Sequence, residues 1–128
     1  IYADCERFSP AQVAYDPWNA GYIATKLTEK QVPLVQFIQG ARSYNPAMHA
    51  CERAYLSGRL RHADDPVLTW CAANLVPRTD ANMNLAPSKK RSPDKIDAMC
   101  ALLMCFGLAE LAEDEGDIAG FIANPIIA

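Results

Sequence analysis

The chain has 128 residues, of which 51% are hydrophobic and 21% are charged, and its formal net charge is −3. This composition is typical of a globular protein that can bury a core, and it excludes a disordered tail. The negative net charge excludes a protein that coats DNA through overall basicity, so any DNA contact must come from a local cluster. No apolar run reaches the roughly 20 residues that a membrane-spanning helix needs.

The start of the chain has no basic segment followed by an apolar stretch, so it does not resemble a signal peptide. It also lacks an initiator Met, and residues 1–8 have the pattern of the last turns of a helix. We therefore expect the chain to be part of a longer protein. The five cysteines include no Cys-x-x-Cys pair. We expect reduced core thiols in a cytoplasmic protein, and neither disulfides nor a zinc site.

The first half of the chain predicts a strand, a helix and a second strand. A short strand over 12–15 leads to Asp16, which the following proline biases towards an extended backbone. A helix with an apolar face is predicted over 20–30. Residues 34–38 predict a second strand that is apolar enough to be buried in a parallel sheet. This order, with short links, is that of a βαβ unit.

The middle of the chain predicts two helices and a hairpin. Asn45 followed by proline is typical of an N-cap and first helical residue, and Gly58 is expected to close that helix. Asp65 followed by proline predicts the start of a shorter helix over 67–73 in the same way. Residues 75–88 are rich in turn formers and predict a hairpin.

The strongest helix signal comes next. Ser92 is expected to cap this helix, with Pro93 as its first residue, and the apolar pattern continues to about Ala112. We therefore predict a folded part over 1–112 and a C-terminal tail over 113–128.

Two carboxylates stand out by position. Asp16 should end a strand, where α/β sheets usually place their sites, and Asp97 should lie early in the long helix beside its core-facing residues. If the helix packs on the sheet, the two acids could hold a divalent metal ion together. An ordinary turn at Asp16 and ordinary helix-dipole chemistry at Asp97 explain the same residues. The residues alone leave both interpretations open.

Four stretches, in order, resemble those of one known family. They are Val13-Ala14-Tyr15-Asp16-Pro17-Trp18-Asn19-Ala20; Phe37-Ile38-Gln39-Gly40; Leu60-Arg61-His62 with Asp65-Pro66-Val67-Leu68; and Pro87-Ser88-Lys89-Lys90-Arg91-Ser92 with Lys95-Ile96-Asp97-Ala98. Over about residues 1–110, their order and spacing resemble the large terminase subunits of phages, in the part that follows the ATPase motor.

The resemblance implies a partial ribonuclease H-like α/β fold, a mostly parallel sheet flanked by helices, with the first strands missing from the fragment. It also implies an endonuclease that uses acidic residues with Mg²⁺ or Mn²⁺ to hydrolyse double-stranded DNA at the start and end of genome packaging. By this resemblance Asp16 is the strand-end metal ligand and Asp97 the ligand on the final helix. The family has another essential Asp upstream of this segment. The two-metal site is therefore expected to be incomplete here, and the fragment weak or inactive.

The cluster of Lys89, Lys90 and Arg91 just precedes the Asp97 helix. It is either a solvated loop or a clamp that fixes DNA through its phosphates. The two tryptophans, Trp18 and Trp70, are expected in the core and not as stacking platforms for bases. The partners that the resemblance implies are double-stranded DNA, the small terminase subunit and the portal protein, in the cytoplasm of the bacterial host. No membrane is implied, and an exposed sheet edge could pair two copies of the chain.

Two other interpretations remain open. The chain could be a non-catalytic prophage remnant that docks to other packaging proteins, with the apolar tail 118–128 as its contact. It could also be another ribonuclease H-like enzyme, such as a transposase or a junction resolvase. His62 is a weak candidate for a general base, since a lone histidine beside an arginine more often lies on the surface.

Overall fold

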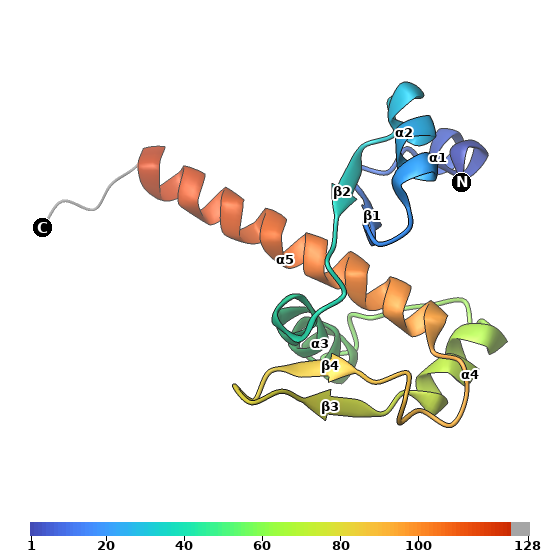
Figure 1. The fold of residues 1–128 in the computed structure, drawn as a ribbon. Coiled ribbons are helices and arrows are strands. Elements are labelled where there is room, and N and C mark those ends of the chain that lie inside the picture. Colours follow the sequence, from blue (N-terminus) through green and yellow to red (C-terminus); the bar gives the residue numbers. More distant parts are fainter. Residues whose placement is uncertain (124–128) are drawn as a thin grey trace, which may run out of the picture.

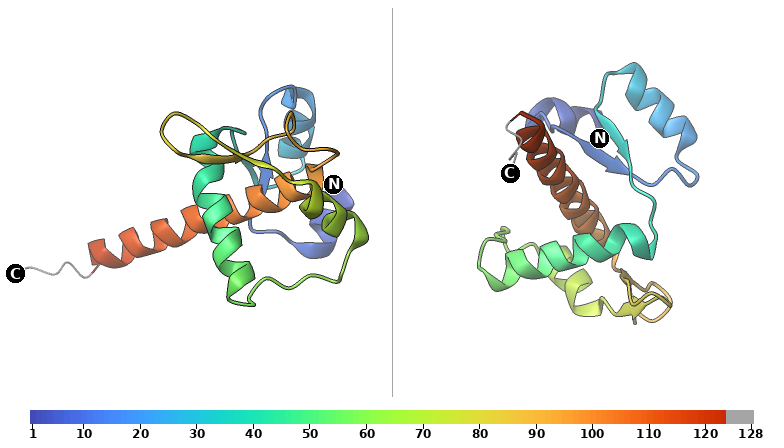
Figure 2. Two further views of the ribbon diagram at one scale, coloured as in Figure 1. Left: turned by 90° about the horizontal axis from the view of Figure 1, so that it is seen from below. Right: turned by 90° about the vertical axis from the view of Figure 1, so that its left-hand side faces the viewer.

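The computed structural model describes the backbone of residues 1–123 and the side chains of residues 1–112. Its elements, in chain order, are α1 (Tyr2–Phe8), β1 (Val13–Tyr15), α2 (Gly21–Glu29), β2 (Leu34–Gln36), α3 (Ala41–Leu56), α4 (Pro66–Asn74), β3 (Pro77–Thr79), β4 (Leu85–Pro87) and α5 (Asp97–Ala123). The long helix α5 runs through the middle of the molecule. α1, α2 and the β1–β2 pair lie on one side of it, and α3, α4 and the β3–β4 hairpin on the other (Figures 1 and 2).

The predicted βαβ unit is confirmed. β1 and β2 are parallel, with Val13 opposite Leu34 and Tyr15 opposite Gln36, and α2 connects them. The prediction that the second strand is buried is wrong, because its residues are half-buried or exposed. The apolar face expected on α2 is also uncovered, since α2 has no buried residue. Within the described residues this sheet has only two strands, so both elements have few neighbours to pack against.

The predicted start of α3 is wrong by about one turn. The helix begins at Ala41, after Gly40 as N-cap, and Pro46 lies inside it. The side chain of Asn45 does not cap the helix, because its Oδ1 accepts a hydrogen bond of 2.9 Å from the backbone N–H of Leu85. Asn45 therefore ties α3 to β4. Gly58 follows the helix in a left-handed conformation, as expected.

The predicted start of the last helix is also wrong. α5 begins at Asp97, while Ser92 lies in the preceding loop and its Oγ accepts a hydrogen bond of 3.1 Å from the N–H of Val76. The helix continues through Ala123, past the end expected near Ala112. The side chains of the predicted tail, residues 113–128, lie outside the described residues. The predicted contact of residues 118–128 with other packaging proteins therefore falls outside them as well.

The predicted Asp65 cap and the predicted hairpin are confirmed. Asp65 caps α4 by accepting a hydrogen bond of 2.8 Å from the N–H of Leu68. β3 and β4 form the expected antiparallel hairpin, in which Pro77 lies opposite Pro87. No helix in the described part of the chain is both long and apolar enough to pass through a lipid bilayer.

The core lies where α3 and β4 pack on α5. One packed cluster of its buried residues contains Phe37, Tyr44, Cys51, Ala86, Leu103 and Met104. All five cysteines are free, and three of them are buried, although Cys105 is exposed. The expectation that both tryptophans are core residues is wrong, because Trp18 is 82% exposed and Trp70 is 45% exposed.

Candidate functional site

Asp97, the first residue of α5, forms an ion pair with Lys89, which lies in the loop after β4. Lys89 Nζ is 2.7 Å from Asp97 Oδ1, and the two side chains are 63% and 64% exposed. The hydrogen bond and charge of Lys89 lower the pKa of Asp97, and the same hydrogen bond raises the pKa of Lys89. The expectation of a costly acid beside the core does not hold, because Asp97 faces solvent while its neighbour Ile96 is buried.

Asp16 follows the last residue of β1, at the carboxyl end of the parallel pair, as predicted. Its Oδ1 accepts a hydrogen bond of 3.1 Å from the backbone N–H of Trp18, which stabilises the turn into α2. Asp16 makes a small contribution to the raised pKa of Lys89, after those of Asp97 and of the Cys100 thiol.

A polar pocket of about 380 Å³ opens beside this ion pair. It is lined by Gln39, Tyr44, Arg78, Pro87, Ser88, Lys89, Lys90 and Cys100. Lys89 also lines a second pocket of about 370 Å³, which contains Asp97. Lys89 thus lies between the two hollows. The cationic side chains of the first pocket, Arg78, Lys89 and Lys90, suit an anion such as a phosphate, whereas the second pocket also contains the acids Asp94 and Asp97.

Tyr44 contributes a polar group to this pocket that the sequence did not indicate. Its hydroxyl is buried and has no hydrogen-bond partner of standard geometry among the described residues. Burial, with smaller contributions from the nearby Cys100 thiol and from Asp16, raises the pKa of Tyr44.

The residues of the predicted DNA clamp have different positions. Lys89 is paired with Asp97, Lys90 lines the polar pocket, and Arg91 is exposed outside both pockets. Arg78, which no sequence signal marked as a site residue, joins Lys89 and Lys90 from the hairpin. The only signal that could have indicated Arg78 is its place on β3, because β3 pairs with β4 and β4 leads into the loop that carries Lys89 and Lys90.

The carboxylates present suit a hydrated Mg²⁺ ion better than a site built wholly by protein. In the part of the chain that the structure describes, no group of three or more His, Cys, Asp or Glu side chains could hold a metal ion. Mg²⁺ commonly binds through one or two carboxylates, keeps several waters and takes further oxygens from substrate phosphates. Asp97, in contact with Lys89, could supply one such oxygen.

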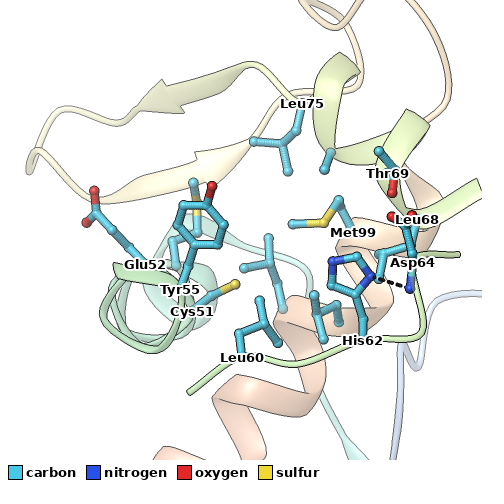
Figure 3. Close-up of a pocket in the computed structure, with 14 residues that line it drawn as sticks. Cys51, Glu52, Tyr55, Leu60, His62, Asp64, Leu68, Thr69, Leu75 and Met99 are labelled. Atoms are coloured by element: carbon cyan, nitrogen blue, oxygen red, sulfur yellow. Dashed lines mark hydrogen bonds between the residues drawn. The ribbon is translucent and has the colours of Figure 1, made fainter. Parts of the chain in front are cut away.

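An apolar pocket of about 500 Å³ is a separate feature (Figure 3). It lies between α3, α4 and α5, and its walls include Met48, Leu60 and Met99. His62 lines this pocket, and its Nδ1 accepts a hydrogen bond of 3.1 Å from the N–H of Asp64. Neither predicted site carboxylate borders it. His62 is therefore not brought to the Asp97 site, and the structure gives its proposed role as a base no support.

Comparisons with known proteins identify the family. A family model described as "Terminase large subunit, endonuclease domain" matches residues 3–113. The chain belongs to this family of terminase endonuclease domains. It is 36% identical over 123 residues to the "Terminase, large subunit" of Enterobacteria phage HK97, which covers 93% of the chain and 24% of that relative. It is also 32% identical over 111 residues to "Protein YmfN" of Escherichia coli K12, which covers 85% of the chain and 24% of that protein.

A solved structure extends this relationship to the fold. The crystal structure of the HK97 bacteriophage large terminase matches with a TM-score of 0.75 and 34% sequence identity, over 84% of the chain and 24% of the HK97 chain. This match agrees with the partial ribonuclease H-like α/β fold that the sequence predicted. The terminase domain described here thus spans about a quarter of the length of these relatives.

Proposed function

We propose that this terminase domain hydrolyses phosphodiester bonds of double-stranded DNA with a divalent metal ion, Mg²⁺ or Mn²⁺. The reaction would make the cuts that begin and end genome packaging. Asp16 and Asp97 would hold the metal, which would supply an activated water and stabilise charge on the phosphate. The proposal combines membership of the family with the position of Asp97 against Lys89 and of Asp16 at the carboxyl end of the parallel strand pair.

The structural observation that supports the proposal is the exposed ion pair at the start of α5. Lys89 Nζ lies 2.7 Å from Asp97 Oδ1, and Asp16 makes only the smallest of the contributions to the raised pKa of Lys89. The assignment of both acids to one metal ion rests on the resemblance to the family. Both side chains of the pair are exposed, and exposed ion pairs contribute only about 0–1 kcal/mol. Replacing Lys89 at Asp97 by another cation therefore costs little.

The other side chains of the site would position the DNA. Lys90 and Arg78, on the wall of the polar pocket, would bind the phosphates that flank the cut. Arg91, exposed just beyond them, would add to the attraction without reading sequence. These contacts are all to phosphates, so the cleavage would have little sequence preference.

Metal binding is the first test of this proposal. Mn²⁺ affinity would be measured on the wild-type chain, on Asp16→Asn and Asp97→Asn, and on Glu29→Gln as a control on the exposed surface of α2. Loss of a group that merely orients a ligand weakens metal binding by about 10–100-fold, so each Asp variant should lose at least that much. Glu29→Gln should bind like wild type. Wild-type affinity in both Asp variants would refute the shared metal site.

Cleavage is the second test. The chain would be incubated with supercoiled plasmid and Mn²⁺. A second reaction would contain a longer protein in which the chain takes the place of the matching part of the HK97 large terminase. We expect the fragment to cut little. We expect the longer protein to cut, and Asp97→Asn to abolish that cutting. Strong cutting by the fragment, abolished by Asp16→Asn, would show that the acid expected upstream is unnecessary. A longer protein that cuts equally well without both acids would refute the proposed roles.

The implied partners can be tested separately. DNA binding through phosphates predicts a linear fall of log affinity with log salt, and neutralising Lys89, Lys90 and Arg91 together should flatten that slope. Contacts with the small terminase subunit and the portal protein are proposed from the family alone. Pairing of two copies through the β1 edge predicts a dimer in sedimentation experiments. If the chain binds a packaging protein but neither Mn²⁺ nor DNA, it is the non-catalytic docking module that the sequence left open.

A further inference from the structure

The polar pocket beside the Lys89–Asp97 pair collects cations from two separate segments. Arg78 lines it from β3, while Lys89 and Lys90 line it from the loop that leads from β4 to the start of α5 (Figure 1). No carboxylate of the described residues lines this pocket, whereas Asp94 and Asp97 line its neighbour. The other lining side chains are uncharged: Gln39, Tyr44, Pro87, Ser88 and Cys100. The pocket is thus a local site of positive charge in a chain whose net charge is −3.

The cations of the pocket are free to bind an anion. Within the described part of the chain, neither Arg78 nor Lys90 forms an ion pair. Hydrogen bonds at the hairpin tip lower the pKa of Asp80, and Arg78 adds only the smallest contribution to that shift. Lys89 is paired with Asp97, but exposed pairs of this kind contribute little, so its ammonium can turn towards an anion. An anion in the pocket would therefore meet up to three cations.

The size of the pocket suits a group that projects from a nucleic acid strand. Its volume of about 380 Å³ lies near the lower end of the range of about 300–1,000 Å³ that is usual for small-ligand pockets. It has room for one phosphate with its waters, and a duplex is too wide to enter it. A phosphate inside a strand carries one negative charge and two free oxygens. A terminal phosphate carries three free oxygens and a charge of about −1.5 to −2 at pH 7, which matches three cations better.

We propose that the polar pocket binds a phosphate monoester, the terminal phosphate that hydrolysis leaves on one of the two new DNA ends. The proposal rests on the proposed function, because cleavage at the adjacent Asp97 would deliver this group. In that reaction water attacks phosphorus, and the bond from phosphorus to one sugar oxygen breaks. One proton of the water goes to the leaving oxygen, and the remaining hydroxyl stays on phosphorus. Lys89 lines both hollows, so the new monoester would form beside the cations.

The charge of the phosphate makes this pocket selective for the product. The new hydroxyl on phosphorus loses its proton above about pH 6, so the second negative charge appears only after the cut. The pocket would therefore bind the cut end more tightly than the uncut strand. After hydrolysis the domain would keep hold of one DNA end instead of releasing both.

The test compares DNA ends in buffer with EDTA, so that no cleavage takes place. Three labelled duplexes of one sequence would carry a 5′-phosphate, a 3′-phosphate or only hydroxyl ends, and their binding to the chain would be followed by fluorescence anisotropy. At pH 7.5 one of the phosphorylated duplexes should bind at least about 5-fold more tightly than the hydroxyl duplex, because charge-assisted hydrogen bonds are the stronger ones. At pH 5 this preference should fall below about 2-fold, because the monoester has lost its second charge.

The charged groups around the pocket should not titrate between these two pH values. The hydrogen bond between Lys89 and Asp97 raises the pKa of the lysine and lowers the pKa of the aspartate. Burial raises the pKa of the Tyr44 hydroxyl and that of the Cys100 thiol. Lysine, arginine and aspartate side chains in general stay charged over this range. The other charged side chains near the pocket are Arg78, Lys90 and, beyond Lys89, Asp16. The hydroxyl duplex, measured at both pH values, corrects for histidines elsewhere on the chain.

The variant that tests the pocket is Arg78→Met with Lys90→Met, which removes two exposed cations and keeps long side chains. It should bind the phosphorylated and hydroxyl duplexes within about 2-fold of each other. The matched control is Arg61→Met, which removes an exposed cation that lines neither polar pocket. It should weaken all duplexes alike and keep the preference of wild type. Equal affinity of wild type for all three duplexes, or a preference that survives at pH 5 or in the double variant, would overturn the proposal.

Inorganic phosphate distinguishes a DNA end from a free anion. It should displace the phosphorylated duplex only at a concentration far above that of the duplex, because the rest of the DNA adds contacts with phosphates. Displacement at about the concentration of the duplex would show a site for a free anion, and the assignment to a DNA end would be wrong.

The two proposals fail in different ways. If Mn²⁺ binding and cleavage depend on Asp16 and Asp97 but the chain shows no preference for a phosphorylated end, only the end site is wrong. If the preference is present and is lost in the double variant, but neither acid affects Mn²⁺ binding, the end site stands. The shared metal site would then be wrong, and the bound ends would be made elsewhere.

Discussion

Gly107→Ala should destabilise the chain, although alanine is normally the better helix residue. A Cβ on Gly107 of α5 would lie 2.5 Å from Cε2 of Phe37 and 3.4 Å from Cβ of Ala47. Phe37 is 4% exposed and packs edge-on against Tyr44, so its ring cannot easily move. Overpacking of a core costs about 1–3 kcal/mol, whereas Gly to Ala in a helix gains about 1 kcal/mol. We expect a net loss of about 1 kcal/mol in the free energy of unfolding.

This perturbation reaches the proposed site because Phe37 is also bound to the end of β1. Its backbone N–H donates to the carbonyl of Tyr15 at 2.8 Å, next to Asp16. Displacing the ring should therefore move Asp16 relative to α5 and weaken Mn²⁺ binding through Asp16 and Asp97. Stability would be measured by urea unfolding followed by circular dichroism, and metal affinity by Mn²⁺ titration.

The matched control is Gly21→Ala, where an added Cβ meets no heavy atom within 4 Å. This change should be neutral or stabilise the chain by up to about 1 kcal/mol. In a Phe37→Leu background, which lacks the opposing ring atoms, Gly107→Ala should cost less or become stabilising. If Gly107→Ala is as stable as Gly21→Ala, or costs the same in both backgrounds, the close approach of Phe37 to α5 is not what excludes a side chain at Gly107.

Three smaller changes test single contacts. The lowered pKa of Asp97 stabilises the folded state above the ordinary pKa of an aspartate, and this stabilisation is lost as the pH falls through the lowered value. Lys89→Met should raise the Asp97 pKa in an NMR titration, with a stability change below about 1 kcal/mol because the pair is exposed; an unchanged midpoint would contradict the ion pair. Asp65→Ala removes the α4 cap and should cost about 1 kcal/mol in urea unfolding, while Asp65→Asn should cost less; equal losses would rule out capping. Asn45→Ala removes the acceptor for the N–H of Leu85, the first residue of β4. It should lower the free energy of unfolding by about 1–3 kcal/mol and speed hydrogen exchange of that amide. Unchanged exchange would show that this bond does not hold β4.

Sequence patterns predicted the elements whose signals are local. The Asp65 cap is made within one turn, and the tip of the hairpin is held by Asp80, whose Oδ1 accepts from the N–H groups of Asn82 and Asn84. The starts of α3 and α5 were misplaced for the opposite reason. Asn45 and Ser92 look like caps, but their side chains bind backbone groups of distant segments. A local pattern cannot distinguish a cap from such a bond.

The candidate site was predicted in the same partial way. Asp16 and Asp97 could be chosen because each stands at the expected end of an element, and the family resemblance gave their order. The ion pair of Lys89 could not be predicted, because it depends on the loop after β4 folding back to the start of α5. Trp18 was expected in the core and instead faces solvent, and Tyr44, for which the sequence gave no expectation, has a buried hydroxyl.

The exposure of the Lys89–Asp97 pair gives the proposed site an order of events. A buried lysine would resist displacement, because removing one partner of a buried ion pair leaves an uncompensated charge. Here both side chains face water, so Lys89 can leave Asp97 at little cost and still be compensated by solvent. A DNA phosphate entering the pocket beside Lys90 would attract the ammonium away from the carboxylate, and Asp97 would then have a free oxygen for a metal ion. DNA and metal should therefore bind cooperatively. Mn²⁺ affinity should rise when a non-cleavable oligonucleotide is added to wild type, and should rise less in Lys89→Met, whose Asp97 has no lysine to lose.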